Sequence, residues 1–144
     1  MGASHAYALR IRGGMPNSLP VSSPRSLCIV VADDEQDSVD MLKLLLNDEG
    51  HDVIGLNKGA EVLDAVARFD PDAVVLDIAM PDRSGYEIAK EIRARYGEVR
   101  PLLIAISGRY KQASDRMLGQ IVGFDHYLVK PYEPSALLKL LRLC

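Results

Sequence analysis

Short apolar runs alternate with stretches of helical periodicity along this chain, and this alternation constrains the fold more than any other feature. Apolar strands that alternate with helices predict a parallel sheet covered by helices on both faces. Because strand–helix–strand crossovers are right-handed, the predicted fold is a doubly wound α/β domain. Five apolar runs are the expected strands, at 27–32, 52–57, 73–77, 102–107 and 124–130.

The helices are predicted from apolar spacing and from residues typical of helix ends. Ser84 is expected to cap one helix, with Glu87 three residues later as in a capping box. Pro134 suits the first position of the last helix, where its missing N–H costs least. The stretch at about 110–121 has few apolar residues and gives the weakest helical pattern. The other helices are expected over 36–48 and around 60–67.

Composition limits the classes of function. The chain has 144 residues and a net charge of −3, with no basic run, which argues against a nucleic-acid-binding surface. No apolar run approaches the roughly 20 residues that span a bilayer. The two cysteines form no metal-type pair, Cys28 is expected to be buried, and the protein is expected in the cytoplasm. Glycine, proline and serine through residues 1–25 predict a flexible extension before a domain at 26–144.

Polar side chains gather where four of the predicted strands end. Asp33 and Asp34 follow the first strand, Asp77 ends the third, Ser107 ends the fourth, and Lys130 ends the fifth. Ligands of open α/β sheets bind at the carboxyl ends of the strands, so these groups should converge.

The chemistry of this group suits phosphoryl transfer. Neighbouring carboxylates repel one another, and oxygen ligands without cysteine or histidine favour Mg²⁺, with Mn²⁺ as an alternative. Lys130 suits a phosphate oxygen, Ser107 can donate a hydrogen bond, and Asp77 is the best placed nucleophile. Each residue alone has an ordinary explanation as a helix cap, a turn residue or a surface charge. Their joint occurrence at four strand ends is the stronger signal.

Over residues 26–143 the sequence resembles the receiver domain of two-component response regulators. The segments that carry the resemblance are "VADDE" after the first strand, "VVLDIAMPDRSGYE" around Asp77, "IAIS" at the fourth strand and "HYLVKP" at the fifth. The resemblance implies a flavodoxin-like (βα)5 fold with strand order 2-1-3-4-5. It also implies that Asp77 accepts a phosphoryl group from a histidine kinase or a histidine phosphotransfer protein.

The resemblance assigns roles to the residues around Asp77. Asp33, Asp34 and Asp77 would bind Mg²⁺ together with the backbone carbonyl of Ala79. Lys130 would pair with a phosphoryl oxygen.

Further roles concern switching. Ser107 would move to hydrogen-bond the phosphoryl group, and Tyr127 would follow as the aromatic switch. Gly108 would leave room for the phosphoryl group, and the Lys130–Pro131 peptide bond is a candidate cis bond. The weak apolar pattern of residues 110–121 fits an output face that binds an unidentified downstream protein, and it fits an ordinary exposed helix equally well.

The chain departs from the family pattern at a few positions. Ser107 stands where threonine is commoner, and Ala79 and Arg109 occupy variable positions that influence phosphoryl lifetime in the family. The resemblance implies a signalling phosphoacceptor that catalyses only its own phosphorylation and dephosphorylation. It implies no contact with nucleic acid or membrane and leaves a homodimer open.

Three alternatives remain at this point. A degenerate receiver would use the fold as a phosphorylation-independent binding module. A phosphatase with an aspartyl intermediate usually has a second acid two residues after the nucleophile, where this chain has Ala79. A dinucleotide-binding domain would need a G-x-G-x-x-G turn after the first strand, and the sequence has acidic residues there.

Overall fold

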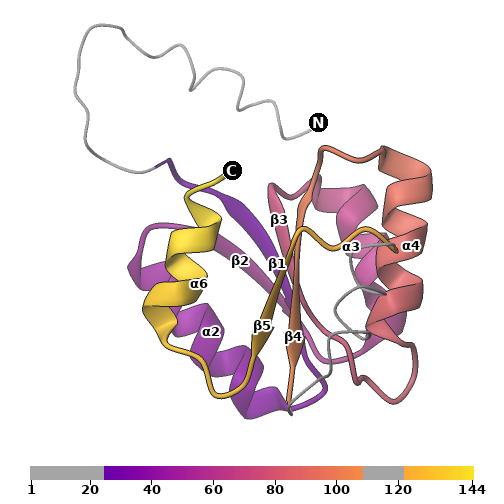
Figure 1. The fold of residues 1–144 in the computed structure, drawn as a ribbon. Coiled ribbons are helices and arrows are strands. Elements are labelled where there is room, and N and C mark those ends of the chain that lie inside the picture. Colours follow the sequence, from indigo (N-terminus) through magenta and orange to yellow (C-terminus); the bar gives the residue numbers. More distant parts are fainter. Residues whose placement is uncertain (1–24, 109–121) are drawn as a thin grey trace, which may run out of the picture.

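A parallel five-stranded sheet forms the centre of the molecule in a computed structural model that describes residues 25–108 and 122–144. The strand order is β2-β1-β3-β4-β5, which confirms the predicted doubly wound topology (Figure 1). The strands are β1 (Cys28–Ala32), β2 (Asp52–Leu56), β3 (Ala73–Asp77), β4 (Leu102–Ser107) and β5 (His126–Val129).

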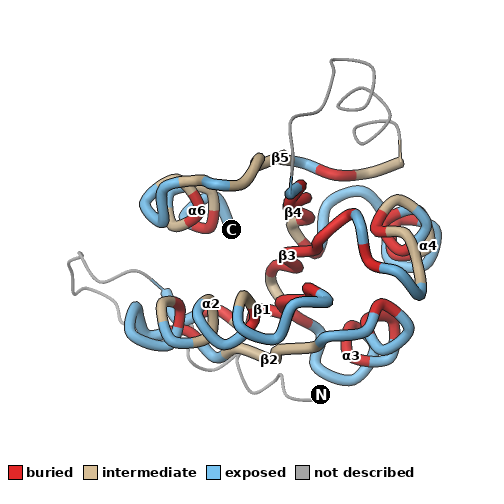
Figure 2. Tube along the Cα trace, turned by 90° about the horizontal axis from the view of Figure 1, so that it is seen from below, coloured by how far each residue is buried: buried red, intermediate tan, exposed pale blue. Residues whose placement is uncertain are grey.

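Helices cover both faces of the sheet. Figure 2 shows α2 and α6 on one side of the strands and α3 and α4 on the other. Their bounds are α2 (Gln36–Asp48), α3 (Val62–Phe69), α4 (Gly85–Tyr96) and α6 (Pro134–Leu141), with a 3-10 turn, η1 (Gly59–Glu61), before α3.

The core follows the two-residue period of the strands. One cluster packs alternate strand residues such as Val74 and Leu76 against α3 and α4. The other packs their neighbours, such as Val75 and Ile104, against α2 and α6. All five residues of β3 are buried, including its last residue, Asp77. The central strand therefore places a carboxylate at the edge of the apolar core, where a buried charge is costly unless it is paired or hydrogen-bonded.

Most predicted elements begin and end where the sequence indicated. The helix at 36–48 and the strands at 73–77 and 102–107 have the expected bounds. The fifth strand is shorter than expected, because the Leu103 amide donates to the Asp125 carboxylate (2.8 Å), just before β5 begins. Residues 1–24 of the extension predicted at 1–25, and the helix expected at 110–121, lie outside the described residues.

Helix capping agrees with the sequence in position but differs in detail. Ser84 is the N-cap of α4, and its Oγ accepts a hydrogen bond from the Tyr86 amide (3.1 Å) rather than from Glu87. The Glu87 carboxylate lies 4.0 Å from the Arg83 guanidinium. Pro134 is the first residue of α6, as expected.

Cys28 is half-buried rather than fully buried as the sequence suggested, because it is the first residue of β1 at the sheet's amino end. Burial and the charge of Asp72 raise the pKa of its thiol to about 11, which keeps it protonated and unreactive. Across the described part of the chain, no helix has the length and apolar character needed to cross a membrane.

Candidate phosphoacceptor site

The carboxyl ends of the strands bring the predicted acidic residues together. Asp33 and Asp34 directly follow β1, and Asp77 ends the neighbouring strand β3. One carboxylate oxygen from each of the three residues lies within 4.8 Å of the other two. Asp33 and Asp77 are buried, whereas Asp34 is exposed at the rim. The site is thus open to solvent on one side and closed by the core on the other.

Lys130 is held at the same rim by Asp33. Its Nζ donates to Asp33 Oδ2 at 2.9 Å, and the other Asp33 oxygen accepts from the Glu35 amide at 2.9 Å. Burial alone would lower the pKa of Lys130, but the hydrogen bond and the charge of Asp33 outweigh it and raise that pKa. The ammonium group therefore stays charged beside the carboxylates.

Asp77 is the most perturbed carboxyl group of this site. Burial raises its pKa from 3.8 to about 6, and the Asp33 charge adds to this. A hydrogen bond from the Ala79 amide to Asp77 Oδ1 (3.0 Å) and the charge of Lys130 act in the opposite direction. At neutral pH Asp77 is ionised although its surroundings disfavour the negative charge. A bound cation would stabilise that charge.

These residues fit a hard divalent ion. The donor set consists of carboxylate oxygens converging from two strand ends, and such sets favour Mg²⁺. Ala79 lies two residues after Asp77 and is exposed, and its amide donates to Asp77 Oδ1 (3.0 Å).

Ser107 and Gly108 complete the rim at the end of β4. Ser107 is 1% exposed, and its carbonyl accepts a hydrogen bond from the Lys130 amide (2.7 Å). Among the described residues, no atom lies within 4 Å of a Cβ built on Gly108. The Lys130–Pro131 peptide bond is cis. Arg109 lies outside the described residues.

Tyr127 lies on β5 with its hydroxyl paired to that of Tyr86. The two oxygens are 3.3 Å apart, and the Tyr86 ring meets the Phe124 ring edge to face. The only signal that the sequence gives for Tyr86 is its place near the start of an amphipathic helix.

A cavity of about 620 Å³ opens beside Asp33 and Lys130. Its walls come from α2 and from the segment between β5 and α6. The cavity has little signal in the sequence: Met41 at its edge is 69% exposed, but a single exposed apolar side chain on a helix is ordinary. The apolar and aromatic lining residues are Met41, Leu42, Leu45, Ile106, Pro131, Tyr132 and Pro134.

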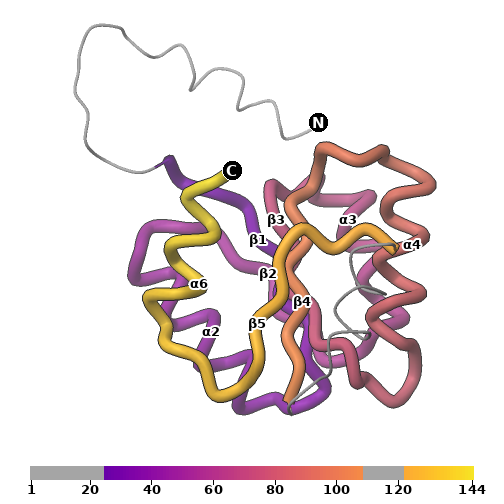
Figure 3. The backbone as a smooth tube through the Cα atoms, viewed as in Figure 1, coloured from indigo at the N-terminus to yellow at the C-terminus, as the bar shows by residue number. Residues whose placement is uncertain are grey.

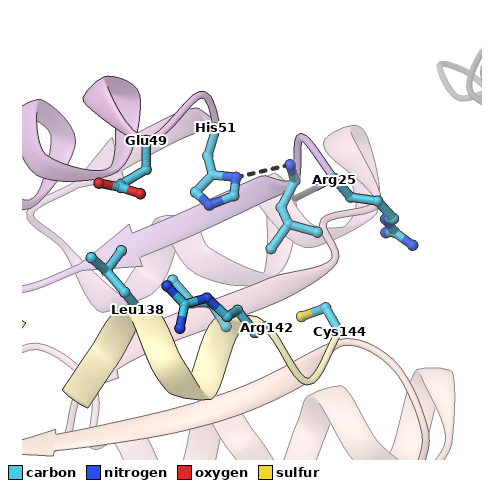
Figure 4. Close-up of a pocket in the computed structure, with 8 residues that line it drawn as sticks. Arg25, Glu49, His51, Leu138, Arg142 and Cys144 are labelled. Atoms are coloured by element: carbon cyan, nitrogen blue, oxygen red, sulfur yellow. Dashed lines mark hydrogen bonds between the residues drawn. The ribbon is translucent and has the colours of Figure 1, made fainter. Parts of the chain in front are cut away.

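A second cavity, of about 330 Å³, lies at the opposite end of the sheet (Figure 4). Arg25 and Cys144 both line it, so the start of the described chain meets its carboxyl terminus there (Figure 3). Two polar side chains that line this cavity already make contacts within the fold. Arg25 pairs with Asp72 (3.3 Å), and His51 Nδ1 accepts from the Leu27 amide (3.1 Å). This cavity is separate from the carboxylate site.

Comparison with known proteins agrees with this geometry. The family model for the response regulator receiver domain matches residues 29–142. The chemotaxis response regulator CheY4 of Vibrio cholerae is 25% identical, with a TM-score of 0.75 over 83% of this chain and 98% of that chain. A signal receiver domain from Bermanella marisrubri is also 25% identical, with a TM-score of 0.72 over 81% and 96% of the two chains.

The same fold is seen in the BeF3-activated receiver domain of Klebsiella pneumoniae RstA. It is 24% identical, with a TM-score of 0.74 over 81% of this chain and 96% of that chain. The family match covers most of the sequence and includes every residue of the carboxylate site. The chain therefore belongs to the receiver domain family of two-component response regulators.

Proposed function

We propose that this domain accepts a phosphoryl group on Asp77 from a histidine kinase or a histidine phosphotransfer protein, and that the reaction depends on Mg²⁺. The observation that carries the proposal is the convergence of Asp33, Asp34 and Asp77 within 4.8 Å, with Lys130 held 2.9 Å from Asp33. The receiver unit would span residues 26–144 and act in the cytoplasm.

In the proposed reaction Asp77 attacks the phosphorus atom of a phosphohistidine. Its Oδ1 already accepts the Ala79 amide, which leaves Oδ2 for the new P–O bond. The P–N bond to the donor imidazole breaks, and the donor nitrogen keeps the electron pair. Lys130 would bind a phosphoryl oxygen, turning from Asp33 as the new charge arrives.

Mg²⁺ would be held by Asp33, Asp34, Asp77 and the Ala79 carbonyl. It would neutralise charge that builds up on the transferred phosphoryl group. Of the chain's own groups, Asp33 has two tasks. It would bind the ion, and its hydrogen bond with the Glu35 amide keeps the carboxylate oriented toward the site.

Phosphorylation would switch a protein-interaction face. The new charge and acceptor oxygens would draw the Ser107 hydroxyl toward Asp77, and Tyr127 would follow. Gly108 would leave room for the phosphoryl group, and the Tyr86 hydroxyl, 3.3 Å from the Tyr127 hydroxyl, would be the partner of Tyr127 in the unphosphorylated state. The downstream partner would be a protein that binds the rearranged face.

The apolar cavity beside the site would receive the phosphodonor protein. It shares Asp33 and Lys130 with the site, so a partner seated in it would bring its phosphohistidine to Asp77. Met41 supplies exposed apolar surface at the edge of this cavity, as expected of a transient protein–protein contact.

The alternative is a degenerate receiver, in which the Lys130–Asp33 pair is only structural. Incubation with acetyl phosphate and Mg²⁺, followed by intact-mass analysis, separates the two functions. Our proposal predicts the gain of one phosphoryl group by the wild type, and none by Asp77→Asn or in EDTA. No gain by the wild type would favour the binding module.

A further inference from the structure

The loop between β3 and α4 carries Ala79, and its two ends are closed against each other. The Ile78 amide donates to the Ile106 carbonyl of β4 (3.0 Å), and the Gly85 amide donates to the Ile78 carbonyl (3.0 Å). A Cβ on Gly85 would lie 2.8 Å from Ile78 Cα, so the close approach needs glycine. The base of this loop is therefore fixed by the sheet and by α4.

The far side of the loop is held by Asp82, which the phosphoacceptor chemistry does not use. Its Oδ1 accepts from the Gly59 amide (3.0 Å), and its Oδ2 accepts from the Ala60 amide (2.9 Å). These amides belong to η1, the turn that opens α3, where backbone N–H groups lack helical partners. Both hydrogen bonds favour the ionised carboxyl group and lower the pKa of Asp82.

The contact is close from both sides. A Cβ on Gly59 would lie 3.1 Å from Arg83 Cβ, 3.1 Å from Ile88 Cδ1 and 3.2 Å from the Arg83 carbonyl oxygen. A methyl group at Gly59 would therefore require these neighbours to move by a few tenths of an ångström. Two independent features, a bidentate carboxylate and a closely packed glycine, define the same contact.

The residues around Asp82 fix the loop to other elements. Arg83 donates to Glu91 on α4 (2.6 Å), and the Met80 side chain is buried in the core. Between these anchors, Asp82 is the side chain that ties the loop to the β2–α3 connection. Loss of its hydrogen bonds would free the exposed segment while leaving the core anchor in place.

We propose that Asp82 is a positioning residue that holds the β3–α4 loop so that the Ala79 carbonyl reaches the Mg²⁺ site. The inference rests on the proposed function, in which this carbonyl is a ligand. If Asp82 served only as a cap for η1 and α3, its loss would lower stability but leave the affinity for Mg²⁺ unchanged. Metal affinity therefore distinguishes positioning from capping.

The test compares Asp82→Ala, Asp82→Asn and Gly59→Ala with the wild type, by calorimetric titration of the metal-free domain with MgCl₂. We expect the Mg²⁺ Kd to rise roughly tenfold for Asp82→Ala, as for other groups that orient metal ligands. Gly59→Ala changes no charge and should show a smaller rise in the same direction. Asp82→Asn keeps one acceptor oxygen and should fall between the wild type and Asp82→Ala.

A matched control removes a carboxylate that makes no such contact. Asp64→Asn replaces an exposed residue of α3 with the same change in charge. It should leave the Kd within about twofold of the wild-type value, since exposed charges at a distance are screened.

Amide hydrogen exchange supplies a second readout. Exchange at Gly59 and Ala60 should accelerate in Asp82→Ala, with strands β1 and β3 still protected, which shows that the variant is folded.

Two results would overturn the inference. One is an unchanged Mg²⁺ Kd in Asp82→Ala and Asp82→Asn. If the wild type still binds Mg²⁺ and accepts phosphoryl groups, this result refutes the inference and leaves the proposed function intact. The other is additive effects in the double variant Asp82→Ala/Gly59→Ala, because a shared contact predicts that the second change adds little. A wild type that binds no Mg²⁺ would refute both the inference and the proposed function.

Discussion

Asp77→Asn should make the metal-free domain more stable at neutral pH. In the folded protein the pKa of Asp77 is raised from 3.8 to about 6, chiefly by burial. The fold thus binds this proton more tightly than the unfolded chain does. The stabilisation from the protonated carboxyl group is fully present below about pH 4 and is lost as the pH rises through about 6. At pH 7.5 the ionised Asp77 lowers the free energy of unfolding.

The magnitude follows from the pKa difference. Each pH unit between the two pKa values corresponds to about 1.4 kcal/mol, so the full effect at pH 7.5 is about 3 kcal/mol. The rim is open to solvent at Asp34, and solvent screening reduces this value. We expect Asp77→Asn to raise the free energy of unfolding by about 1 to 2 kcal/mol, since asparagine keeps the shape and an acceptor for the Ala79 amide.

Urea unfolding in EDTA at pH 7.5 and at pH 4.5 measures this effect. The difference between the variant and the wild type should be largest at pH 7.5 and should shrink at pH 4.5. Asp64→Asn, which removes an exposed carboxylate, should change stability by less than about 0.5 kcal/mol at both values. An Asp77→Asn protein that is no more stable than the wild type at pH 7.5 would refute the argument from burial and Asp33.

Other predictions follow from single contacts. Lys130→Ala leaves the buried Asp33 carboxylate without its cation, so the domain should lose about 1 to 3 kcal/mol in urea unfolding and phosphorylate slowly with acetyl phosphate. Arg93→Ala breaks the 2.7 Å pair with Asp125 and should cost about 3 kcal/mol in the same assay, but calorimetry should show unchanged Mg²⁺ affinity. Met41→Ala should slow phosphoryl transfer from a protein donor severalfold and leave the acetyl phosphate rate unchanged; equal slowing of both rates would remove the docking argument.

Much of the site could be predicted from the sequence. The apolar patterns of strands and helices locate the elements, and ligands of open α/β sheets bind at the carboxyl ends of the strands. Apolar runs of strand length place Asp33, Asp77, Ser107 and Lys130 at strand ends, and parallel strands bring their carboxyl ends to one edge. The structure brings these residues to that edge, with Asp33 and Asp77 buried and Lys130 paired to Asp33.

The remaining features depend on tertiary contacts that no local pattern encodes. The Asp82 contact with Gly59 and Ala60 joins residues more than 20 positions apart, and "PD" followed by "RS" is typical of any turn. The pairing of Tyr86 with Tyr127 depends on how α4 packs on β5. The late start of the fifth strand depends on the Asp125 side chain, which accepts the hydrogen bond of the Leu103 amide just before β5.

Locating the modified residue tests the central claim most directly. After reaction with acetyl phosphate and Mg²⁺, borohydride reduces an aspartyl phosphate to homoserine, and peptide mapping by mass spectrometry then finds the reduced position. The account predicts homoserine at residue 77 and at no other aspartate, with the signal absent when EDTA replaces Mg²⁺. Homoserine at Asp33 or Asp34, or a signal at residue 77 that persists in EDTA, would contradict it.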